Sequence, residues 1–281
     1  MKKKIFWLCL LLLLSFFYIC WRLDFLPVNL KRRDPNTGKR FHAATKMVWG
    51  EFWKNRSVLT DNPVALLYKI YPDVEKIKLP PPNYAGKQLE ASIKKVLPDG
   101  SFSGEAISLD ELSQILFSAD GIIKKDDRID IRTAPVPLPQ TGSFSHMHPV
   151  EIYVLARNVS GVKKGLYHYS ALEHSLELID GEASQMPNCC FEQSVVDNSA
   201  VAIILTGIPS RLTWAHDTRS YRYMYMAAGA VSQNIYLECA SLGLISSATA
   251  SFHDDLYNKM LGIDGENEVT LLLHLVGKIK E

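Results

Sequence analysis

The sequence contains few cysteines and no excess of charge of either sign. Five cysteines occur in 281 residues, and their spacing lacks the pairs that are typical of a disulfide framework or a zinc site. Lysine and arginine together number 31, aspartate and glutamate 30, so the formal net charge is +1. We therefore expect no nucleic-acid partner, because binding a phosphate backbone requires a basic surface.

Several motifs for catalysis and nucleotide binding are absent as well. The chain has no G-x-G-x-x-G after a strand, no G-x-x-x-x-G-K-[S/T], no G-x-S-x-G and no H-E-x-x-H. These absences argue against a Rossmann dinucleotide-binding site, a P-loop, the nucleophile of an α/β-hydrolase and the zinc site of a metalloprotease. His146 and His148 form an H-x-H pair, but no third or fourth ligand can be named, so no metal site is predicted.

The first 21 residues differ in kind from the rest of the chain. Lys2 to Lys4 precede an uncharged apolar run from Ile5 to Trp21, whose length is at the short end for a membrane-spanning helix. A cleaved signal peptide is the alternative, but the run lacks a small-x-small cleavage site. We expect residues 1–21 to be a retained transmembrane anchor. Positive charge flanks the run on both sides, so its orientation stays open.

The remainder of the chain divides into a linker and one domain. Residues 22–40 are polar and basic and contain Pro27, Pro35 and Gly38, which is typical of a linker. Residues 41–281 are long enough for one sizeable domain. Helical and strand patterns alternate irregularly along this part, with at least one hairpin, which predicts an α+β layered fold.

The spacing of apolar residues predicts the main elements. Ser108 and Glu111 form a capping box that starts a helix over 108–119. A second helix over 254–261 ends at Gly262. Continuous apolar runs and one hairpin pattern predict buried strands at 150–156, 166–169, 176–179, 200–206 and 269–276.

The longest predicted element is a helix over 219–244. Its apolar stripe consists of Met224, Ala228, Val231, Ile235, Cys239 and Leu242. Gly243 follows the stripe and suits a left-handed helix end. Four small residues occupy 227–230, although Gly229 costs a helix about 1 kcal/mol relative to alanine. Such a run fits a helix buried in a core, or one that lets a flat ligand or another backbone come close.

Several stretches follow one another in the order of a known family's motifs. They are FHAATK (41–46), YPDVEKIKLP (71–80), HPVEIYVLARNVSGVKKGLYHYSALEHSLELI (148–179), RSYRYMYMAAGAVSQNIYLECASLGL (219–244) and SFHDDLYNKMLGIDGENEV (251–269). Together they resemble the SagB-type dehydrogenases, the thiazole/oxazole-forming branch of the nitroreductase family. The resemblance runs from Phe41 to the C-terminus.

The resemblance implies a fold and an activity. The fold is nitroreductase-like, with a central, mostly antiparallel sheet flanked by helices, and the protein is a homodimer with FMN at the subunit interface. The activity is an FMN-dependent oxidation or reduction of a peptide or small organic substrate, with the hydride passing through flavin N5. In such enzymes the protein supplies binding, orientation and electrostatics. A heterodimer with an active homologue is an alternative.

The resemblance also implies site residues. His216, which follows Trp214, is the candidate acid/base because imidazole titrates near neutral pH. The expected FMN-binding residues are Lys94 and Lys95 for the phosphate, Ser143 and Ser145 in the loop from the partner subunit, Arg219 and Gly229 on the long helix, and Gly243, Ser246 and Ser247 in the turn that follows it.

The chain departs from the family pattern at several of these places. Val96, Leu97 and Gly100 stand where arginines are usual before the capped helix. A lysine binds phosphate only as a point charge, without the fork of an arginine. Ala230 replaces a histidine of the long helix, and the Lys-Tyr pair that follows the tryptophan in azoline-oxidising members is missing. The alternative is therefore a non-catalytic protein of the same fold that serves as an accessory or partner-binding subunit.

The expected location is the membrane. FMN is loaded most easily in the cytoplasm, and free thiols are typical of cytoplasmic proteins. We expect the domain to face the cytoplasm, with an exported domain as the alternative, since Lys2 to Lys4 also fit an anchor with its N-terminus inside.

Overall fold

The chain forms two compact units, Met1–Lys46 and Met47–Glu281. The computed structural model describes residues 15, 34, 36–46, 68–95, 101–125, 130–134, 148–183, 185–187 and 192–280. Within these residues, no helix has both the length and the apolar character needed to cross a membrane. Apart from Ser15, the anchor predicted at residues 1–21 lies outside them.

The first unit contains a short helix, α2 (Thr37–Ala44), which buries none of its side chains. The boundary between linker and domain that we expect at residues 40 and 41 falls inside this helix. The helix ends at Thr45, whose hydroxyl donates to the Phe41 carbonyl oxygen over 2.7 Å. The FHAATK motif therefore forms the end of α2.

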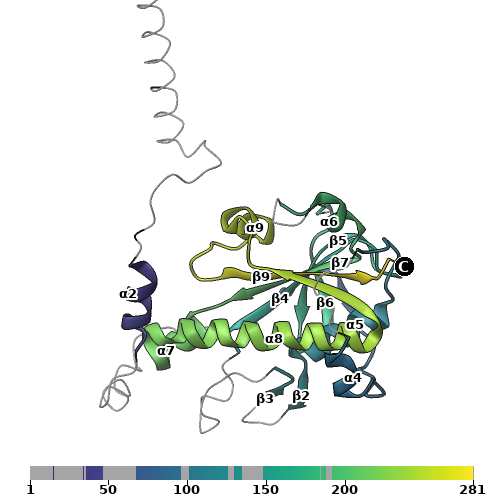
Figure 1. Ribbon diagram of the computed structural model, residues 1–281, viewed down its shortest axis with the longest axis horizontal. Coiled ribbons are helices and arrows are strands. Elements are labelled where there is room, and N and C mark those ends of the chain that lie inside the picture. Colours follow the sequence, from purple (N-terminus) through teal and green to yellow (C-terminus); the bar gives the residue numbers. More distant parts are fainter. Residues whose placement is uncertain are drawn as a thin grey trace, which may run out of the picture. The chain divides into compact units, whose positions relative to one another are not determined.

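A seven-stranded sheet is the centre of the second unit (Figure 1). In spatial order its strands are β1 (Lys76–Lys78), β6 (Ser175–Asp180), β5 (Gly165–Ser170), β4 (Val150–Ala156), β7 (Val201–Gly207), β9 (Val269–Lys278) and β8 (Leu244–Thr249). Every pair of neighbours in this sheet is antiparallel. The predicted α+β class and the predicted central sheet are confirmed.

Helices cover both faces of the sheet, and two further strands form a small second sheet. The helices are α4 (Leu89–Ile93), α5 (Leu109–Asp120), α6 (Gln193–Asn198), α7 (Ser210–His216), the 3-10 turn η3 (Asp217–Arg219), α8 (Ser220–Leu242) and α9 (Asp254–Leu261). The second sheet pairs β2 (Ile122–Lys125) with β3 (Asp130–Arg132). Figure 1 shows α8 running across one side of the sheet, with α6 and α9 on the other side.

The core consists of two main layers, because the central strands bury both faces. Successive side chains of a strand point to opposite faces. Val150, Ile152 and Val154 of β4 accordingly pack with α5 and α8, whereas Tyr153 and Leu155 pack with residues of α6 and α9. A strand that is buried on both faces reads as a continuous apolar run, which is why the central strands were predictable from sequence.

The predicted helix ends are confirmed. Ser108 and Glu111 form the reciprocal capping box that starts α5. Gly243 ends α8 with φ of 80°, and Gly262 ends α9 with φ of 68°, both in the left-handed region that glycine adopts without strain. Five of the six predicted stripe residues of α8 are buried, namely Met224, Ala228, Val231, Ile235 and Cys239, whereas Leu242 is half-buried. The helix is shorter than the predicted 219–244, because Arg219 belongs to a 3-10 turn and Leu244 begins a strand.

Candidate functional site

One edge of the sheet brings together several of the predicted cofactor residues. Strand β8 leaves α8 through Gly243 and pairs only with β9 among the described strands, so its other edge carries no ladder of hydrogen bonds. Leu244 lies opposite Lys278 at one end of this pair, and Thr249 lies opposite Leu273 at the other. The edge of β8 therefore runs from the lysine-containing end of β9 to the turn that precedes α9.

The end of β9 lies beside the segment that precedes α5. Phe102 forms a bridge with Ile279, Ser103 N–H donates to the Lys278 carbonyl oxygen over 3.0 Å, and Lys280 N–H donates to the Ser101 carbonyl oxygen over 2.8 Å. Residues 96–100, which contain the positions where the resemblance predicts phosphate-binding arginines, come directly before these residues and lie outside the described residues. Lys278 and Lys280 add cationic side chains at this end, and Lys278 Nζ lies 3.4 Å from a Glu105 carboxylate oxygen.

The other end of β8 lies beside the middle of α8. Ala248 N–H of β8 donates to the Tyr236 hydroxyl of α8 over 2.9 Å. Gly229, about two turns before Tyr236 in α8, is exposed. A Cβ atom added to it would have no described atom within 4 Å. Packing within the described chain therefore does not require a glycine at this position.

Ser246 and Ser247, which were predicted in a turn after the long helix, are instead buried in strand β8. Ser246 Oγ lies 2.8 Å from His274 Nδ1, and the other ring nitrogen of His274 lies 2.9 Å from Ser232 Oγ on α8. Burial lowers the pKa of His274 to about 3, so the imidazole is neutral at neutral pH. The His274 ring, on β9, thus links β8 to α8. The predicted contact of Ser246 with a cofactor stays a prediction.

His216 and Arg219 form a separate group at the start of α8. Arg219 Nε donates to the Tyr223 hydroxyl over 3.0 Å, and the His216 ring lies edge-on to the Tyr223 ring with centroids 5.0 Å apart. Burial, and then the charge of Arg219, lower the pKa of His216, which favours the neutral base form at neutral pH. Because α8 has 23 residues, Arg219 and Gly243 lie roughly 35 Å apart along its axis.

The remaining predicted residues fall at the margin of the described structure. Lys94 and Lys95 are exposed directly after α4, where the described chain stops before residue 96. Ser143 and Ser145 lie outside the described residues. Within the described part, no group of three or more His, Cys, Asp or Glu side chains is arranged to hold a metal ion.

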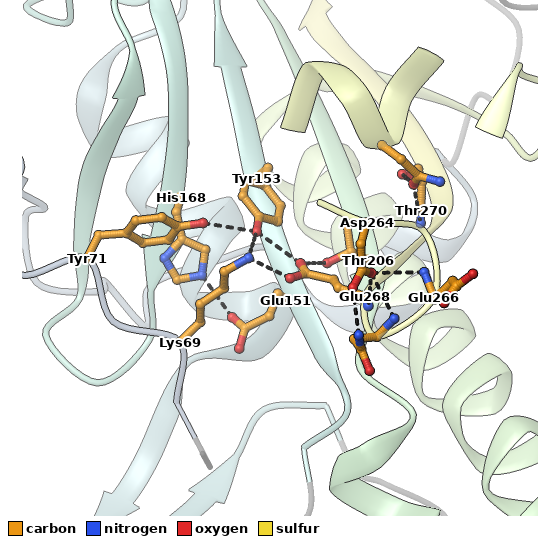
Figure 2. Close-up of polar contacts among 12 residues, drawn as sticks. Lys69, Tyr71, Glu151, Tyr153, His168, Thr206, Asp264, Glu266, Glu268 and Thr270 are labelled. Atoms are coloured by element: carbon orange, nitrogen blue, oxygen red, sulfur yellow. Dashed lines mark hydrogen bonds and ion pairs between the residues drawn. The ribbon is translucent and has the colours of Figure 1, made fainter. Parts of the chain in front are cut away.

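A buried polar network lies on the face of the sheet opposite α8, and the sequence assigned it no role (Figure 2). Glu268, just before β9, accepts hydrogen bonds from the Tyr153 hydroxyl (2.9 Å) and the Thr206 hydroxyl (2.6 Å). Lys69 Nζ donates to the other Glu268 oxygen and to the Tyr153 hydroxyl. Burial and then the Glu268 charge raise the pKa of Tyr153, so its phenol stays protonated.

A histidine between two glutamates continues this network. His168 Nδ1 and Nε2 each lie 2.9 Å from a carboxylate, that of Glu177 and that of Glu151 respectively. Burial lowers the pKa of His168, but the hydrogen bonds to both glutamates outweigh it and raise the pKa above its ordinary value. Arg211 pairs with Glu151, and Lys76 pairs with Glu177. The network therefore alternates cations and anions.

Strand register explains how this network assembles. Tyr153 lies opposite His168, His168 opposite Glu177, and Glu177 opposite Lys76, which makes one row across β4, β5, β6 and β1. The sequence signal was the alternation of Glu151 and Tyr153 in an otherwise apolar strand, because residues two apart share a face. This alternation predicts a polar row, but it does not name Lys69 or Glu268 as its partners.

Comparison with known proteins identifies the family. Residues 101–278 match the sequence model of the nitroreductase family. A relative from Methanocaldococcus jannaschii, whose name places it among the nitroreductases, is 31% identical over 209 residues, which is 74% of this chain and 94% of the relative. The chain belongs to the nitroreductase family.

Other relatives of this nitroreductase-family chain are more distant. The trifolitoxin-processing protein TfxB of Rhizobium leguminosarum bv. trifolii is 29% identical over 124 residues, which is 42% of this chain and 33% of that protein. A nitroreductase-named crystal structure from Anabaena variabilis has a TM-score of 0.62 at 23% identity and covers 86% of this chain and 47% of its own. A chain of the E. coli microcin synthetase McbBCD complex has a TM-score of 0.53 at 18% identity, covering 89% and 95%. These two likenesses show the fold.

Proposed function

We propose that this nitroreductase-family chain is an FMN-dependent oxidoreductase that acts on a peptide or small organic substrate, as the SagB-type resemblance implies. The family match and the identity to the M. jannaschii relative support the oxidoreductase class. The partial identity to a protein named for trifolitoxin processing supports a peptide as substrate. The fold shared with a chain of a microcin synthetase complex agrees with this choice.

The observation that carries the proposal is the exposed glycine in the middle of α8. Glycine costs a helix about 1 kcal/mol relative to alanine, and no described atom would meet a Cβ at Gly229. A requirement from outside the described chain accounts for this cost, such as a flat ring or a second backbone lying against the helix. Strand β8 lies beside α8, where Ala248 N–H donates to the Tyr236 hydroxyl.

The residues of the β8 edge fit FMN in their chemistry. A flavin phosphate is an anion, and β9 ends beside Ser101 to Ser103 with Lys278, which lies 3.4 Å from a Glu105 carboxylate oxygen, and with the exposed Lys280. A flat ring needs close approach to backbone, which the exposed Gly229 permits. When bound, FMN supplies hydride transfer, while the chain binds it, orients it and limits its contact with water.

The length of α8 supports a site shared by two chains. Arg219 and Gly243 lie roughly 35 Å apart along the helix, so one flavin does not reach both ends of the same helix. The outer side of α8 carries Tyr225 and Met226, which are 52% and 58% exposed. Exposed apolar side chains gathered on one surface are typical of an interaction site. We infer a homodimer, or a heterodimer with an active homologue, that forms through this side of α8.

His216 is the proposed acid/base of the reaction. Its lowered pKa keeps the imidazole neutral at neutral pH, which suits proton abstraction. It lies at the start of α8, far from Gly243 of its own chain. In a shared site, His216 therefore serves the flavin that the partner's β8 edge helps to bind.

A non-catalytic protein of the same fold is the second candidate. The specific observation in its favour is the replacement of the expected phosphate-binding arginines by Val96, Leu97 and Gly100. The lysines at the end of β9 provide charge without the bidentate geometry of arginine. In this second candidate, the chain serves as an accessory or partner-binding subunit.

The N-terminal segment 1–21 is the proposed membrane anchor, with the domain on the cytoplasmic side. The uncharged run from Ile5 to Trp21 supports an anchor, and loading of FMN in the cytoplasm supports the orientation. A reporter enzyme fused after Glu281 tests the side of the membrane. Activity from a reporter that works only outside the cytoplasm would contradict the cytoplasmic orientation.

Substitution of Gly229 tests where the cofactor lies. Because no described atom lies near its Cβ position, leucine at this position leaves the fold intact, but it fills the space against the helix where a flavin is expected. Gly229→Leu is expected to lose FMN binding and FMN-dependent turnover, while Gly38→Leu, at an exposed glycine of α2, keeps both. Equal flavin content in folded Gly229→Leu protein would contradict this placement.

A further inference from the structure

An open pocket of about 360 Å³ lies at one end of the main sheet, where β4 ends and β7 begins. Three segments supply its lining, namely the stretch before α5, the connection from β4 to β5, and the end of α6. The described lining residues are Gly104, Arg157, Asn158, Lys164, Asp197 and Ser199. None of them belongs to α8, the helix through which we infer the dimer contact. The volume is within the range of small-molecule sites.

Hydrogen bonds between the three segments hold the walls of this pocket in place. Asn158 N–H, directly after β4, donates to the Ala200 carbonyl oxygen over 2.9 Å, and the Asn158 side-chain amide donates to the Gly104 carbonyl oxygen over 2.8 Å. The Arg157 guanidinium donates to the Ser199 hydroxyl. The pocket is therefore formed by the folded chain itself, as is usual for ligand sites.

Charges of both signs line the pocket without pairing with each other. Arg157 and Lys164 are its cations, and Asp197 is its anion. One Asp197 oxygen accepts a hydrogen bond from the Gln193 side-chain amide over 2.8 Å. Among the described residues, neither Lys164 nor Asp197 forms an ion pair. Both charges therefore remain available to a ligand that reaches them.

The lining of the pocket is polar, which restricts the ligands that fit. Apart from Gly104, each described lining residue carries a charge, an amide or a hydroxyl on its side chain. An apolar ligand would take these groups out of water without replacing their hydrogen bonds, which is unfavourable. A purely anionic ligand is repelled by the carboxylate, and a purely cationic ligand is repelled by the two cations. A ligand that carries one charge of each sign avoids both penalties.

We propose that this pocket binds a zwitterion of the amino-acid class, with its carboxylate at Arg157 and Lys164 and its ammonium group at Asp197. The planar guanidinium group matches the geometry of a carboxylate, and the lysine adds a point charge. The free Asp197 oxygen accepts from the ammonium group. The inference concerns binding alone and is independent of FMN in the proposed function.

The test uses the full-length chain and three probes of similar size at neutral pH. The free amino acid alanine carries both charges, propionate carries the carboxylate alone, and alaninamide carries the ammonium group alone. Ligand-observed NMR titration measures the affinity of each. Alanine is expected to bind saturably and at least about threefold more tightly than either of the other probes, since it gains both charge contacts.

Substitution of the carboxylate is expected to move two probes in opposite directions. Asp197→Asn removes the partner of the ammonium group, so alanine binds at least about threefold more weakly. The same change removes the repulsion of a carboxylate, so propionate binds more tightly. Glu192→Gln, at an exposed carboxylate before α6 and outside the pocket, is the matched control and leaves both affinities unchanged.

Substitution of the exposed lysine tests the cationic side of the pocket. Lys164→Gln is expected to weaken alanine and propionate at least about threefold without weakening alaninamide. Lys163→Gln is the matched control, because the neighbouring Lys163 lies 3.9 Å from a Glu75 carboxylate oxygen and outside the pocket. Absence of saturable alanine binding, equal affinity for alanine and propionate, or unchanged affinities in Asp197→Asn or Lys164→Gln would overturn the proposal.

Discussion

The Tyr153 hydroxyl donates a hydrogen bond to the Glu268 carboxylate over 2.9 Å, which joins the middle of β4 to the loop before β9. Lys69 donates to both groups, so the same contact also holds the segment that precedes β1. Side-chain exposure of Glu268 is 9%, and Tyr153 is fully buried. Removing one partner therefore leaves buried polar groups without their hydrogen bonds.

Glu268→Ala is expected to destabilise the domain by about 3–5 kcal/mol. The substitution removes the carboxylate that accepts hydrogen bonds from Lys69 and from the Tyr153 and Thr206 hydroxyls. Urea denaturation at neutral pH measures the change. Glu266→Ala, at an exposed position of the same loop, is the matched control and is expected to change stability by less than about 0.5 kcal/mol. A cost below about 1 kcal/mol for Glu268→Ala would show that the network contributes little.

His168 makes stability decrease as pH rises. Its pKa is raised in the folded state, so the folded protein holds a proton that the unfolded chain, with a pKa of about 6.5, releases. The stabilisation is fully present below that pH and is lost as pH rises through the folded-state pKa. The stability difference between the unchanged chain and His168→Gln is therefore expected to shrink from pH 6 to alkaline pH.

His253 provides the control for this experiment. It is exposed before α9, and its side chain does not cap the helix. In the same urea titrations, His253→Gln shows the effect of replacing an exposed histidine outside the network. A pH-independent difference for His168→Gln would mean that its charge does not support the two glutamates.

His274 has the opposite effect, in acid. Burial lowers its pKa to about 3, so the unfolded chain binds a proton below about pH 6.5 while the folded chain does not. Its contribution is present above that pH and falls as pH drops. From pH 7 to pH 5 the unchanged chain is expected to lose about 2 kcal/mol relative to His274→Asn. Urea denaturation at both values measures this, and equal losses in the two proteins would contradict it.

Gly229→Ala tests whether the glycine serves anything within the fold. The added methyl group meets no described atom, and alanine favours a helix interior by about 1 kcal/mol. The cofactor-free protein is therefore expected to unfold at a higher temperature than the unchanged chain. Destabilisation by this substitution would show that a contact within the chain, rather than an external ring or backbone, requires the glycine.

The sequence predicted the fold where local signals agree with burial. The capping box at Ser108, the glycines after α8 and α9, and the apolar runs of β4, β7 and β9 each follow from short-range chemistry. The family resemblance supplied the order of the elements, which periodicity alone does not determine. The membrane anchor and the loop with Ser143 and Ser145 lie outside the described residues and stay predictions.

The contacts within the site were harder to predict, because they join residues far apart in sequence. Lys69 and Glu268 are separated by 199 positions, and Ser246 meets His274 through strand register that no local pattern encodes. Linear motifs also placed Arg219 and Gly243 in one site, whereas a straight helix holds them roughly 35 Å apart. A prediction that combines both ends of α8 therefore needs the second chain.

The central claim, that the chain binds FMN and uses it, is tested most directly by the visible absorbance of the purified full-length protein. The proposed function predicts a yellow protein that releases FMN in stoichiometric amounts on denaturation, with absorbance that bleaches under a reductant and returns in air. A folded, colourless protein that does not take up added FMN would contradict the claim and favour the non-catalytic alternative.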